Sequence, residues 1–587
     1  MSSLRNWLFC GPLLIGLMVP AWNVVNAQGT ALAPKTSGES DTDGSDSPTL
    51  VVSTSKLDQL LPHISYLMRA VNQPELSGLA NMMVSNYTQG MDKTRPLGVA
   101  VILSEVGNPT PVIMLPVSDI DMFFNAIAQF GQPDDLGDGL YSLEVGPQPV
   151  FAQFSEEWLL VSPDEDAVTE FDYDPADLLG KLSNRYDIGV RLDLQSVPDE
   201  LRDSLMAQMR DAFERASSAG MTQAKQDAEA AIKAAKTDEE RAAAEGRIAG
   251  FEASMEMQAR QMDSIEEMVD DIETVVFGLT ADSAAKQLSI EFATEFIEDS
   301  NLDKQAAFSA TAKTAFSGLT SSREVMSLHG SNLALPETLE DAKANVDVAF
   351  GQLERMLEGV ESKMPGVTAM ASEFKAIVLE TVEEGVSDTA VSVSIDEQVS
   401  IVAAVHVADG NKIAAFLETN YDKLRGYDEN LPLIKFNNGN HKGVTLHLGA
   451  VTLPPDAPSE LTRVLGSPVA FAIGTADKAI YVCVGPDSET KLKAAIDGVV
   501  EKSSPVAGNP FDMKVQLIPI LQYIQTIKSD PVVEAMIEGA SQSSGKDFVN
   551  VVTRMLPHGV LARVAIDEGV LKAIGSAVKA GQGGRRR

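Results

Sequence analysis

Gly98-Val99-Ala100-Val101-Ile102-Leu103 and Ala390-Val391-Ser392-Val393-Ser394-Ile395 are the two stretches on which the fold prediction rests. Each is followed by a second apolar run, at 111–117 and 399–407 respectively, and then by an apolar helix pattern. Alternation of apolar and polar residues in the second stretch predicts antiparallel strands with one covered face. Asp119 and Asp409 stand where each helix would begin, so we interpret both as helix N-caps.

The similarity between the two regions continues downstream. Residues 139–146 match 443–449, residues 158–164 match 480–487, and residues 187–192 match 512–517. A final strand pair is expected near Val275–Phe292 in the first copy and near Val560–Val578 in the second. A repeat of this length is typical of duplicated structural modules. The fold class predicted is therefore α+β, with two related modules at 51–315 and 316–580.

Each predicted module begins with helices. Apolar residues recur at helical spacing over 57–68 and over 339–357, and Pro336 can serve as a first helical residue. Helices of this kind can cover the apolar side of an antiparallel sheet.

An insertion at 198–272 interrupts the first module. It is rich in Ala, Glu, Lys and Met, and its apolar positions from Ile248 to Ile272 follow a heptad seam. Thr237 and Glu240 have the spacing of a capping box that would start a second helix. We expect a long coiled-coil-like helical hairpin. Periodicity leaves open whether this hairpin folds onto its own module or serves as a partner-binding arm.

Composition excludes several classes of protein. The chain has 587 residues, 46 Lys and Arg against 84 Asp and Glu, and a net charge of −38. Its apolar content of 44% is enough to build cores, which excludes a disordered acidic chain. Two cysteines exclude a disulfide-stapled miniprotein, and the absence of a clustered basic surface argues against nucleic acid as a partner.

The amino terminus is typical of an exported protein. Residues 1–27 have one basic residue, an apolar run and a small-residue cleavage pattern, which together indicate a secretory signal peptide. Residues 28–50 form an acidic linker rich in Ser and Gly that we expect to be disordered, and 581–587 form a basic flexible tail. Cleavage would leave no transmembrane helix in a periplasmic or extracellular protein, whereas an uncleaved signal would act as an anchor.

Motifs that carry chemistry are missing from the sequence. None of the six histidines pairs with another at zinc-ligand spacing, although His406, His441 and His447 could lie on neighbouring strands. The glycine-rich stretch 539–547 departs twice from a phosphate loop. Cys483, the only thiol left after signal cleavage, lies in an apolar strand-like run and is interpreted as a buried hydrophobe. We therefore predict neither catalytic nor cofactor-binding residues.

The densest acidic cluster lies between residues 164 and 177. Asp164, Asp166, Asp172 and Asp174 are candidate ligands for calcium, because hard cations bind several carboxylate oxygens. The alternative is that these acids occupy a solvated loop and the starts of helices, where they favour the helix dipole. We favour this alternative interpretation and therefore expect no cofactor. Calcium is the only cofactor for which the sequence offers candidate ligands.

In its layout of signal peptide, acidic linker and duplicated α+β modules, the chain resembles large bacterial envelope or secreted proteins of unknown function. This resemblance implies export and no particular activity. The main hypothesis is a non-enzymatic protein that binds another macromolecule, or forms a scaffold in the cell envelope, through the 198–272 hairpin. The alternatives are a protein that binds a small ligand or calcium, and a hydrolase with scattered active-site residues. The oligomeric state is not predicted.

Overall fold

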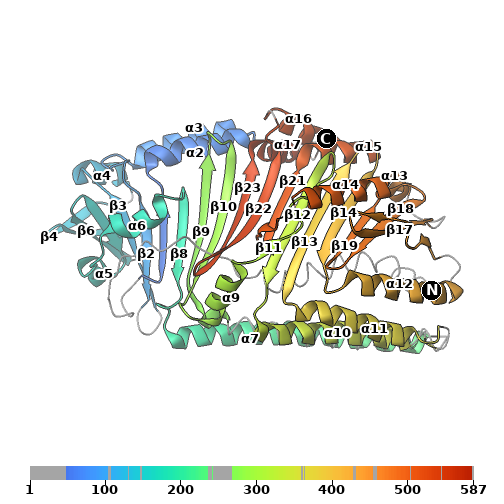
Figure 1. The fold of residues 1–587 in the computed structure, drawn as a ribbon. Coiled ribbons are helices and arrows are strands. Elements are labelled where there is room, and N and C mark those ends of the chain that lie inside the picture. Colours follow the sequence, from blue (N-terminus) through green and yellow to red (C-terminus); the bar gives the residue numbers. More distant parts are fainter. Residues whose placement is uncertain are drawn as a thin grey trace. The chain divides into compact units, whose positions relative to one another are not determined.

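The computed structural model describes residues 48–103, 108–129, 131–145, 148–235, 241, 268–358, 361, 364–427, 431–453, 459–502, 504–543 and 545–584. Helices and strands are mixed, and the strands form a large antiparallel sheet (Figure 1). This confirms the broad α+β fold class that the sequence predicted. Contacts divide the chain into two compact units. One contains Gly29–Ser204, Ile272–Asp303 and Lys514–Arg587, and is called the β1 unit here. The other contains Leu205–Asp271 and Lys304–Met513, and is called the β13 unit.

The β1 unit has a long antiparallel run of strands. Their order across the sheet is β22 (Phe548–Leu556), β23 (Gly559–Asp567), β10 (Gln287–Phe296), β9 (Ile272–Asp282), β8 (Ile188–Asp193), β1 (Leu50–Thr54), β2 (Gly98–Leu103), β3 (Pro109–Pro116), β7 (Trp158–Ser162), β6 (Gln148–Ser155), β5 (Leu140–Val145) and β4 (Pro133–Gly137).

The helices of this unit follow the strands closely. They are α2 (Leu57–Ala70), α3 (Pro74–Tyr87), α4 (Ile120–Ile127), α5 (Glu165–Thr169), α6 (Pro175–Ser183), α15 (Leu517–Ile527), α16 (Pro531–Ser541) and α17 (Glu568–Gly584). Figure 1 shows α2 and α3 at the end of strands β9 and β10. There Tyr66 and Ala70 of α2 pack with Leu571 of α17 against Ala281 of β9. These helices therefore close one end of the sheet.

The main core of the β1 unit lies on one face of this sheet. Val51, Ala100, Val112 and Met114 alternate with residues of the opposite face and are almost fully buried. Helix α6 covers them through Leu179 and Leu182, together with Tyr186 just beyond the helix. Alternation of side chains along a strand is what separates the two faces.

The β13 unit has its own antiparallel run. Its order is β12 (Glu324–Leu333), β13 (Val386–Ile395), β14 (Val399–His406), β19 (Ala479–Val484), β18 (Val469–Ala476) and β17 (Val444–Val451), with the short β15 (Leu433–Lys435) and β16 (Asn440–His441) both along β17. A separate pair joins β11 (Lys313–Thr314) to β20 (Val506–Ala507). The helices are η1 (Pro336–Thr338), α10 (Leu339–Glu358), α11 (Val367–Glu383), α12 (Gly410–Tyr427), α13 (Ser459–Leu465) and α14 (Ser488–Glu501).

Helix α14 covers the core face of this second run. Leu492, Ala495 and Ile496 are fully buried against strand residues that include Ala472 and Cys483. On the opposite face, α12 and α11 contribute Ile413 and Ile377 to a second cluster around Ile473. Both faces of this run therefore have helical cover over part of their area.

Three elements continue from the residues of one unit into those of the other: α7 (Asp199–Ala234), α9 (Asn301–Ser309) and β21 (Phe511–Gln516). The units thus interleave along the chain, whereas the sequence was interpreted as two consecutive modules at 51–315 and 316–580. The pairing of β10 with β23 explains the difference, because it joins residues 287–295 to residues 559–567. Such long-range pairing leaves no local signal in the sequence.

Several local predictions are confirmed and one is wrong. Helices occur at 57–70 and 339–358, and Pro336 begins the short helix that precedes α10. The final strand pair of the second copy was expected near Val560–Val578, but the pair is β22 and β23, and α17 occupies 568–584. Helix α17 also extends into the predicted flexible tail. The signal segment 1–27 and most of the linker 28–50 lie outside the described residues.

Candidate functional site

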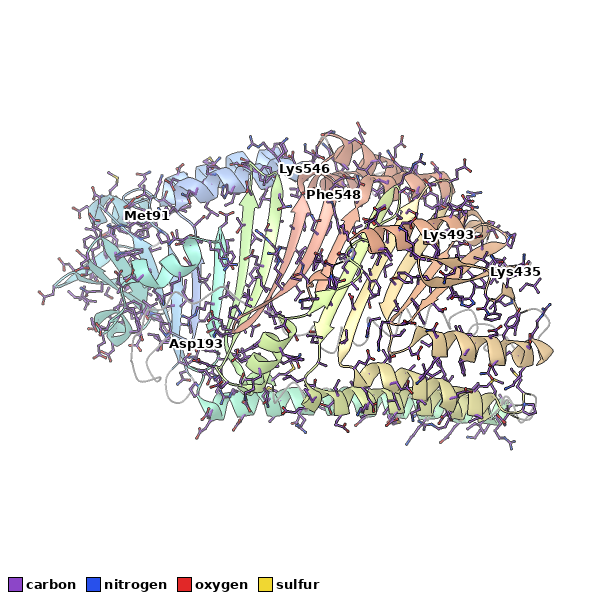
Figure 2. All side chains as sticks on the ribbon, viewed as in Figure 1. Met91, Asp193, Lys435, Lys493, Lys546 and Phe548 are labelled. Atoms are coloured by element: carbon purple, nitrogen blue, oxygen red, sulfur yellow. The ribbon has the colours of Figure 1, made fainter. Side chains whose placement is uncertain are left out.

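The insertion at 198–272 leaves and re-enters the sheet at one place. Strand β8 ends at Asp193 (Figure 2), and β9, its neighbour in the sheet, begins at Ile272. The backbone N–H of Leu194 donates to the carbonyl of Glu273 at 3.0 Å. The side-chain amide of Gln195 donates to the carbonyl of Ile272 at 2.9 Å. The two ends of the insertion are therefore hydrogen-bonded to each other.

The outgoing part of this insertion is the helix α7, which is 36 residues long. At ~1.5 Å per residue, a helix of that length spans about 54 Å. Most of its described side chains are exposed, and Ala228 is a buried exception at 3% exposure. From Leu205 onward its residues group with the β13 unit. The predicted capping box at Thr237 and Glu240, and most of the heptad seam, lie outside the described residues.

The acidic segment 164–177 contains two helix starts. The carboxylate of Asp164 caps α5 by accepting from the backbone N–H of Asp166 at 3.2 Å, and that of Asp174 caps α6 by accepting from Ala176 at 2.8 Å. Asp166 and Asp172 are exposed. Two of the four calcium candidates thus have the capping role that the alternative interpretation describes.

The structure brings part of this acidic segment to a shallow hollow. Asp164, Glu165 and Asp166 line a space of about 510 Å³ together with Thr110 and Phe151, among others. Asp172 and Asp174 do not line it. Among the residues that the structure describes, no three His, Cys, Asp or Glu side chains lie close enough to hold a metal ion.

A second hollow, of about 590 Å³, lies at the start of α4. Its lining includes Asn86, Asp119, Asp121 and Asn125. Asp119 accepts a hydrogen bond from the backbone N–H of Met122 at 2.9 Å, which confirms its predicted N-cap role. Asp409 does the same before α12 by accepting from the backbone N–H groups of Asn411 and Lys412.

The three histidines considered for a metal site each bond to a different partner. His406 Nε2 lies 2.8 Å from Glu384, and His441 Nε2 lies 2.7 Å from Asp497. His447 is buried, and its Nε2 lies 3.1 Å from the Thr475 hydroxyl. Burial also lowers the pKa of His447 below its usual value, which favours the neutral ring. Separate partners of this kind are typical of structural histidines.

Cys483 is confirmed as a buried hydrophobe. It has no solvent exposure and lies among Ala472, Ala404 and Leu492 in the core of the β13 unit. Burial raises the pKa of its thiol to about 12, so the thiolate needed for nucleophilic attack does not form at neutral pH.

Asp187 is the centre of a buried cluster that sequence reasoning missed. One carboxylate oxygen accepts from the Ser55 hydroxyl at 3.2 Å and lies 2.7 Å from His63 Nδ1. The other accepts from the backbone N–H of Ala281 at 2.7 Å. The serine and the histidine both bond to the carboxylate, so this geometry orients a buried acid rather than activating a serine for attack.

Glu291 is the centre of a second cluster that the sequence did not reveal. It is 7% exposed and lies on β10. One carboxylate oxygen accepts from Arg185 Nη2 at 2.8 Å and from the Tyr186 hydroxyl at 3.0 Å, and the other lies 3.1 Å from Arg563 Nε. Burial next to this carboxylate raises the pKa of Tyr186. A buried acid with two arginines and a tyrosine is fully paired, which is what a structural network requires.

Comparisons with protein-family models, with curated proteins and with solved structures gave no match to this chain. Within the described part of the chain, no helix has both the length and the apolarity that a membrane crossing requires.

Proposed function

We propose that this chain is an exported, non-enzymatic protein that binds another macromolecule, or forms a scaffold in the cell envelope, through the 198–272 insertion. The observation that carries the proposal is the pair of hydrogen bonds that join Leu194 and Gln195 to Glu273 and Ile272. These hydrogen bonds hold the two ends of the 77-residue segment 195–271 together between the neighbouring strands β8 and β9.

We infer that the insertion is a helical hairpin, and a length argument supports this. Helix α7 leads about 54 Å away from its start, and residues 235–271 must return over the same distance. A return of 37 residues in helical form spans about 55 Å, which matches the outgoing helix. The heptad seam from Ile248 to Ile272 supplies the apolar stripe that packing against α7 needs. These points support an antiparallel hairpin with exposed polar sides for a partner.

We further propose that the chain arose by internal duplication. In the β1 unit the strands run β1, β2, β3, β7, β6, β5 and β4 across the sheet. In the β13 unit they run β12, β13, β14, β19, β18, β17 and β15. The order of connection along the chain is the same in both, and the capped helices at Asp119 and Asp409 follow the equivalent strands β3 and β14. This agreement supports duplication more strongly than the sequence similarity alone.

The proposed export, to the periplasm or the extracellular space, is based on the signal-peptide pattern of residues 1–27. Envelope proteins that assemble with others need a stable folded body and an accessible contact element. The two compact units would supply the first and the hairpin the second.

The test replaces residues 198–270 with a short Gly-Ser linker, which the adjacency of Gln195 and Ile272 allows. Wild type and variant are cross-linked in the native cell envelope, isolated, and compared for associated proteins. We expect a stoichiometric partner with the wild type and its loss in the variant, while thermal unfolding shows that the sheets remain folded. A partner retained by the variant would exclude the hairpin as the contact, and a wild type that emerges alone would contradict the proposal.

Calcium binding is the second candidate, because Asp164 and Asp166 both line the hollow of about 510 Å³. Two carboxylates would supply part of the shell, with water and backbone carbonyl oxygens as the remaining ligands. Calcium ligation at these carboxylates would raise the melting temperature in calcium relative to chelator. The double variant Asp164→Asn and Asp166→Asn should abolish that difference. Equal melting temperatures of the wild type in calcium and in chelator would exclude this candidate.

A further inference from the structure

Asp388 on β13 is a buried carboxylate with incomplete hydrogen bonding. It is 4% exposed, and its cross-strand neighbour on β12, Ser331, is 1% exposed. Among the residues that the structure describes, neither Asp388 Oδ1 nor Ser331 Oγ has a hydrogen-bond partner. The same is true of Nδ1 of His329, which lies two residues from Ser331 on the same face of β12. Polar atoms buried in this way cost free energy, so the place is sensitive to a change of charge.

The second oxygen of Asp388 holds a segment that covers this place. Asp388 Oδ2 accepts a hydrogen bond from the backbone N–H of Ala315 at 2.7 Å. Ala315 directly follows β11, and β11 pairs with β20. Residues 312–316 and 506–509, which contain this strand pair, are called the clasp below.

The clasp lies directly on the strands. The side chains of Ala312, Thr314 and Phe316 are all buried. The backbone of Gly508 packs so closely on Ser331 that a Cβ at this glycine would collide with it. Opening of the clasp would therefore bring water to the buried polar atoms beneath it.

The ionisation of Asp388 depends on whether the clasp is closed. In the closed clasp, the carboxylate accepts from one backbone N–H and has almost no contact with water. Burial raises its pKa from 3.8 to about 6, against the smaller lowering effects of hydrogen bonds from Ala315 and Thr314. In the open clasp, water would solvate the carboxylate and return its pKa toward the ordinary value. Loss of the proton therefore favours the open clasp.

Other titratable groups face Asp388 from the neighbouring strands. His406 on β14 favours ionisation of Asp388 when it is charged, but less than burial opposes it, and its Nε2 lies 2.8 Å from Glu384. Burial raises the pKa of Tyr481 on β19 to about 12, so its hydroxyl stays neutral. Burial lowers the pKa of His329 and favours its neutral ring. Charged groups further along the packed elements are Lys313 on the clasp, Glu324 on β12, and Lys502 and Asp512 on either side of β20.

We propose that Asp388 is the sensor of a pH-dependent clasp, which stays closed on the strands while Asp388 carries its proton and opens more often once the proton is lost. Opening would expose Phe316, whose ring packs on that of Tyr481 with 5.9 Å between the centroids. The acidity of the surroundings thus controls access to the edge of an apolar core. This inference goes beyond the proposed partner binding and is independent of it, because the clasp and Asp388 lie outside the 198–272 insertion.

The test is hydrogen–deuterium exchange of the full chain between pH 4 and pH 7, read by mass spectrometry and corrected for the intrinsic pH dependence of exchange. We expect the opening equilibrium of peptides that cover 312–316 to rise about fiftyfold over this range, as linkage gives for a pKa of about 6 in the closed clasp and 3.8 in the open one. These peptides should also be less protected than those of β17 and β18, whose exchange requires unfolding of the whole unit.

Two variants separate the charge of Asp388 from its hydrogen bond. Asp388→Asn keeps an acceptor for Ala315 but cannot ionise, so its clasp should open equally at pH 4 and pH 7. Asp388→Leu should be equally independent of pH but more open at pH 4, because the acceptor is lost as well. Asp547→Asn is the matched control: Asp547 is fully buried, but its oxygens accept from Gln516 and from the Ile518 N–H. Its clasp should keep the wild-type pH dependence.

Three results would overturn the proposal. The first is a wild-type clasp whose opening does not change between pH 4 and pH 7. The second is a pH dependence that Asp388→Asn retains. The third is protection of the clasp equal to that of β17 and β18, because the clasp would then open only when the whole unit unfolds.

Discussion

Two cross-strand pairs, one residue apart on β9 and β10, have opposite environments. Glu291 pairs with Gly278, and its carboxylate is buried among two arginines and a tyrosine. Phe292 pairs with Phe277, and both rings are more than a third exposed. A charged residue is therefore inside and two aromatic residues are outside, which reverses the usual distribution. The difference shows that the burial of this sheet depends on which face its own helices cover.

Glu291→Ala should give the largest effect on stability. It removes the shared acceptor of the buried Tyr186 hydroxyl, of the partly exposed Arg185 and of Arg563, whose side chain is 54% exposed. We expect the free energy of unfolding to fall by about 3 kcal/mol, measured by urea denaturation, because the Tyr186 hydroxyl stays buried without a partner while both arginines can reach water. A loss below about 1 kcal/mol would mean that the network is screened by solvent, and the contrast between the faces would disappear.

Gly278→Ala tests how tightly the covered face is packed. A Cβ at this position would meet the ring of Tyr186, which packs directly on the glycine. Displacing the ring should cost about 2 to 3 kcal/mol and loosen its hydrogen bond to Glu291. Gly351→Ala is the control, because a Cβ there meets no atom within 4 Å and alanine favours a helix. Equal melting temperatures for the Gly278 variant and wild type would contradict the packing.

Asp388→Asn tests a buried carboxylate of the β13 unit that, unlike Glu291, has a hydrogen-bond partner on only one of its two oxygens. One oxygen of Asp388 accepts from the Ala315 N–H at 2.7 Å, and the other has no hydrogen-bond partner. Burial raises the pKa of Asp388 from its usual 3.8 to about 6. The folded state then binds a proton more tightly than the unfolded state, so stability is lost as the pH rises from about 4 to about 6.

We expect Asp388→Asn to increase the free energy of unfolding at neutral pH. At pH 7 the asparagine variant should be more stable than wild type by about 3 kcal/mol, because it avoids burying the charge. Below pH 4 the two proteins should unfold alike. Chemical denaturation at pH 4 and pH 7 measures both, and an advantage that does not change with pH would exclude ionisation of Asp388 as its cause.

Phe292→Ser should give the smallest effect on folding. A side chain that is already exposed loses little burial, so we expect a loss of less than about 1 kcal/mol. Phe296→Ser on the same strand is the control and should cost several times more, because Phe296 is 3% exposed. A large cost for Phe292 alone would show that this face is covered within the chain.

Local features were predictable from the sequence because their causes are local. The N-cap roles of Asp119 and Asp409 depend on neighbours two or three residues away. The burial of Cys483 follows from an apolar strand of six residues. The helices at 57–70 and 339–358 follow from spacing alone. The hydrogen bonds of Asp187 to Ser55, His63 and Ala281 bring together parts of the chain far apart in sequence, and no pattern indicated them.

By itself, the sequence determined the α+β class, the antiparallel strands, the long polar insertion and the strong negative charge, because propensity, periodicity and composition set these. Tertiary structure alone decided which face of each strand is covered by helices. In residues 287–296, alternation indicates only that Leu288, Ile290 and Phe292 share one face and Ser289, Glu291 and Ala293 the other. In the folded structure the face with Ser289, Glu291 and Ala293 is buried. Long-range pairing with β23 places Arg563, a partner of Glu291, on that same face. A strand pattern separates two faces, and only the packing of distant elements chooses between them.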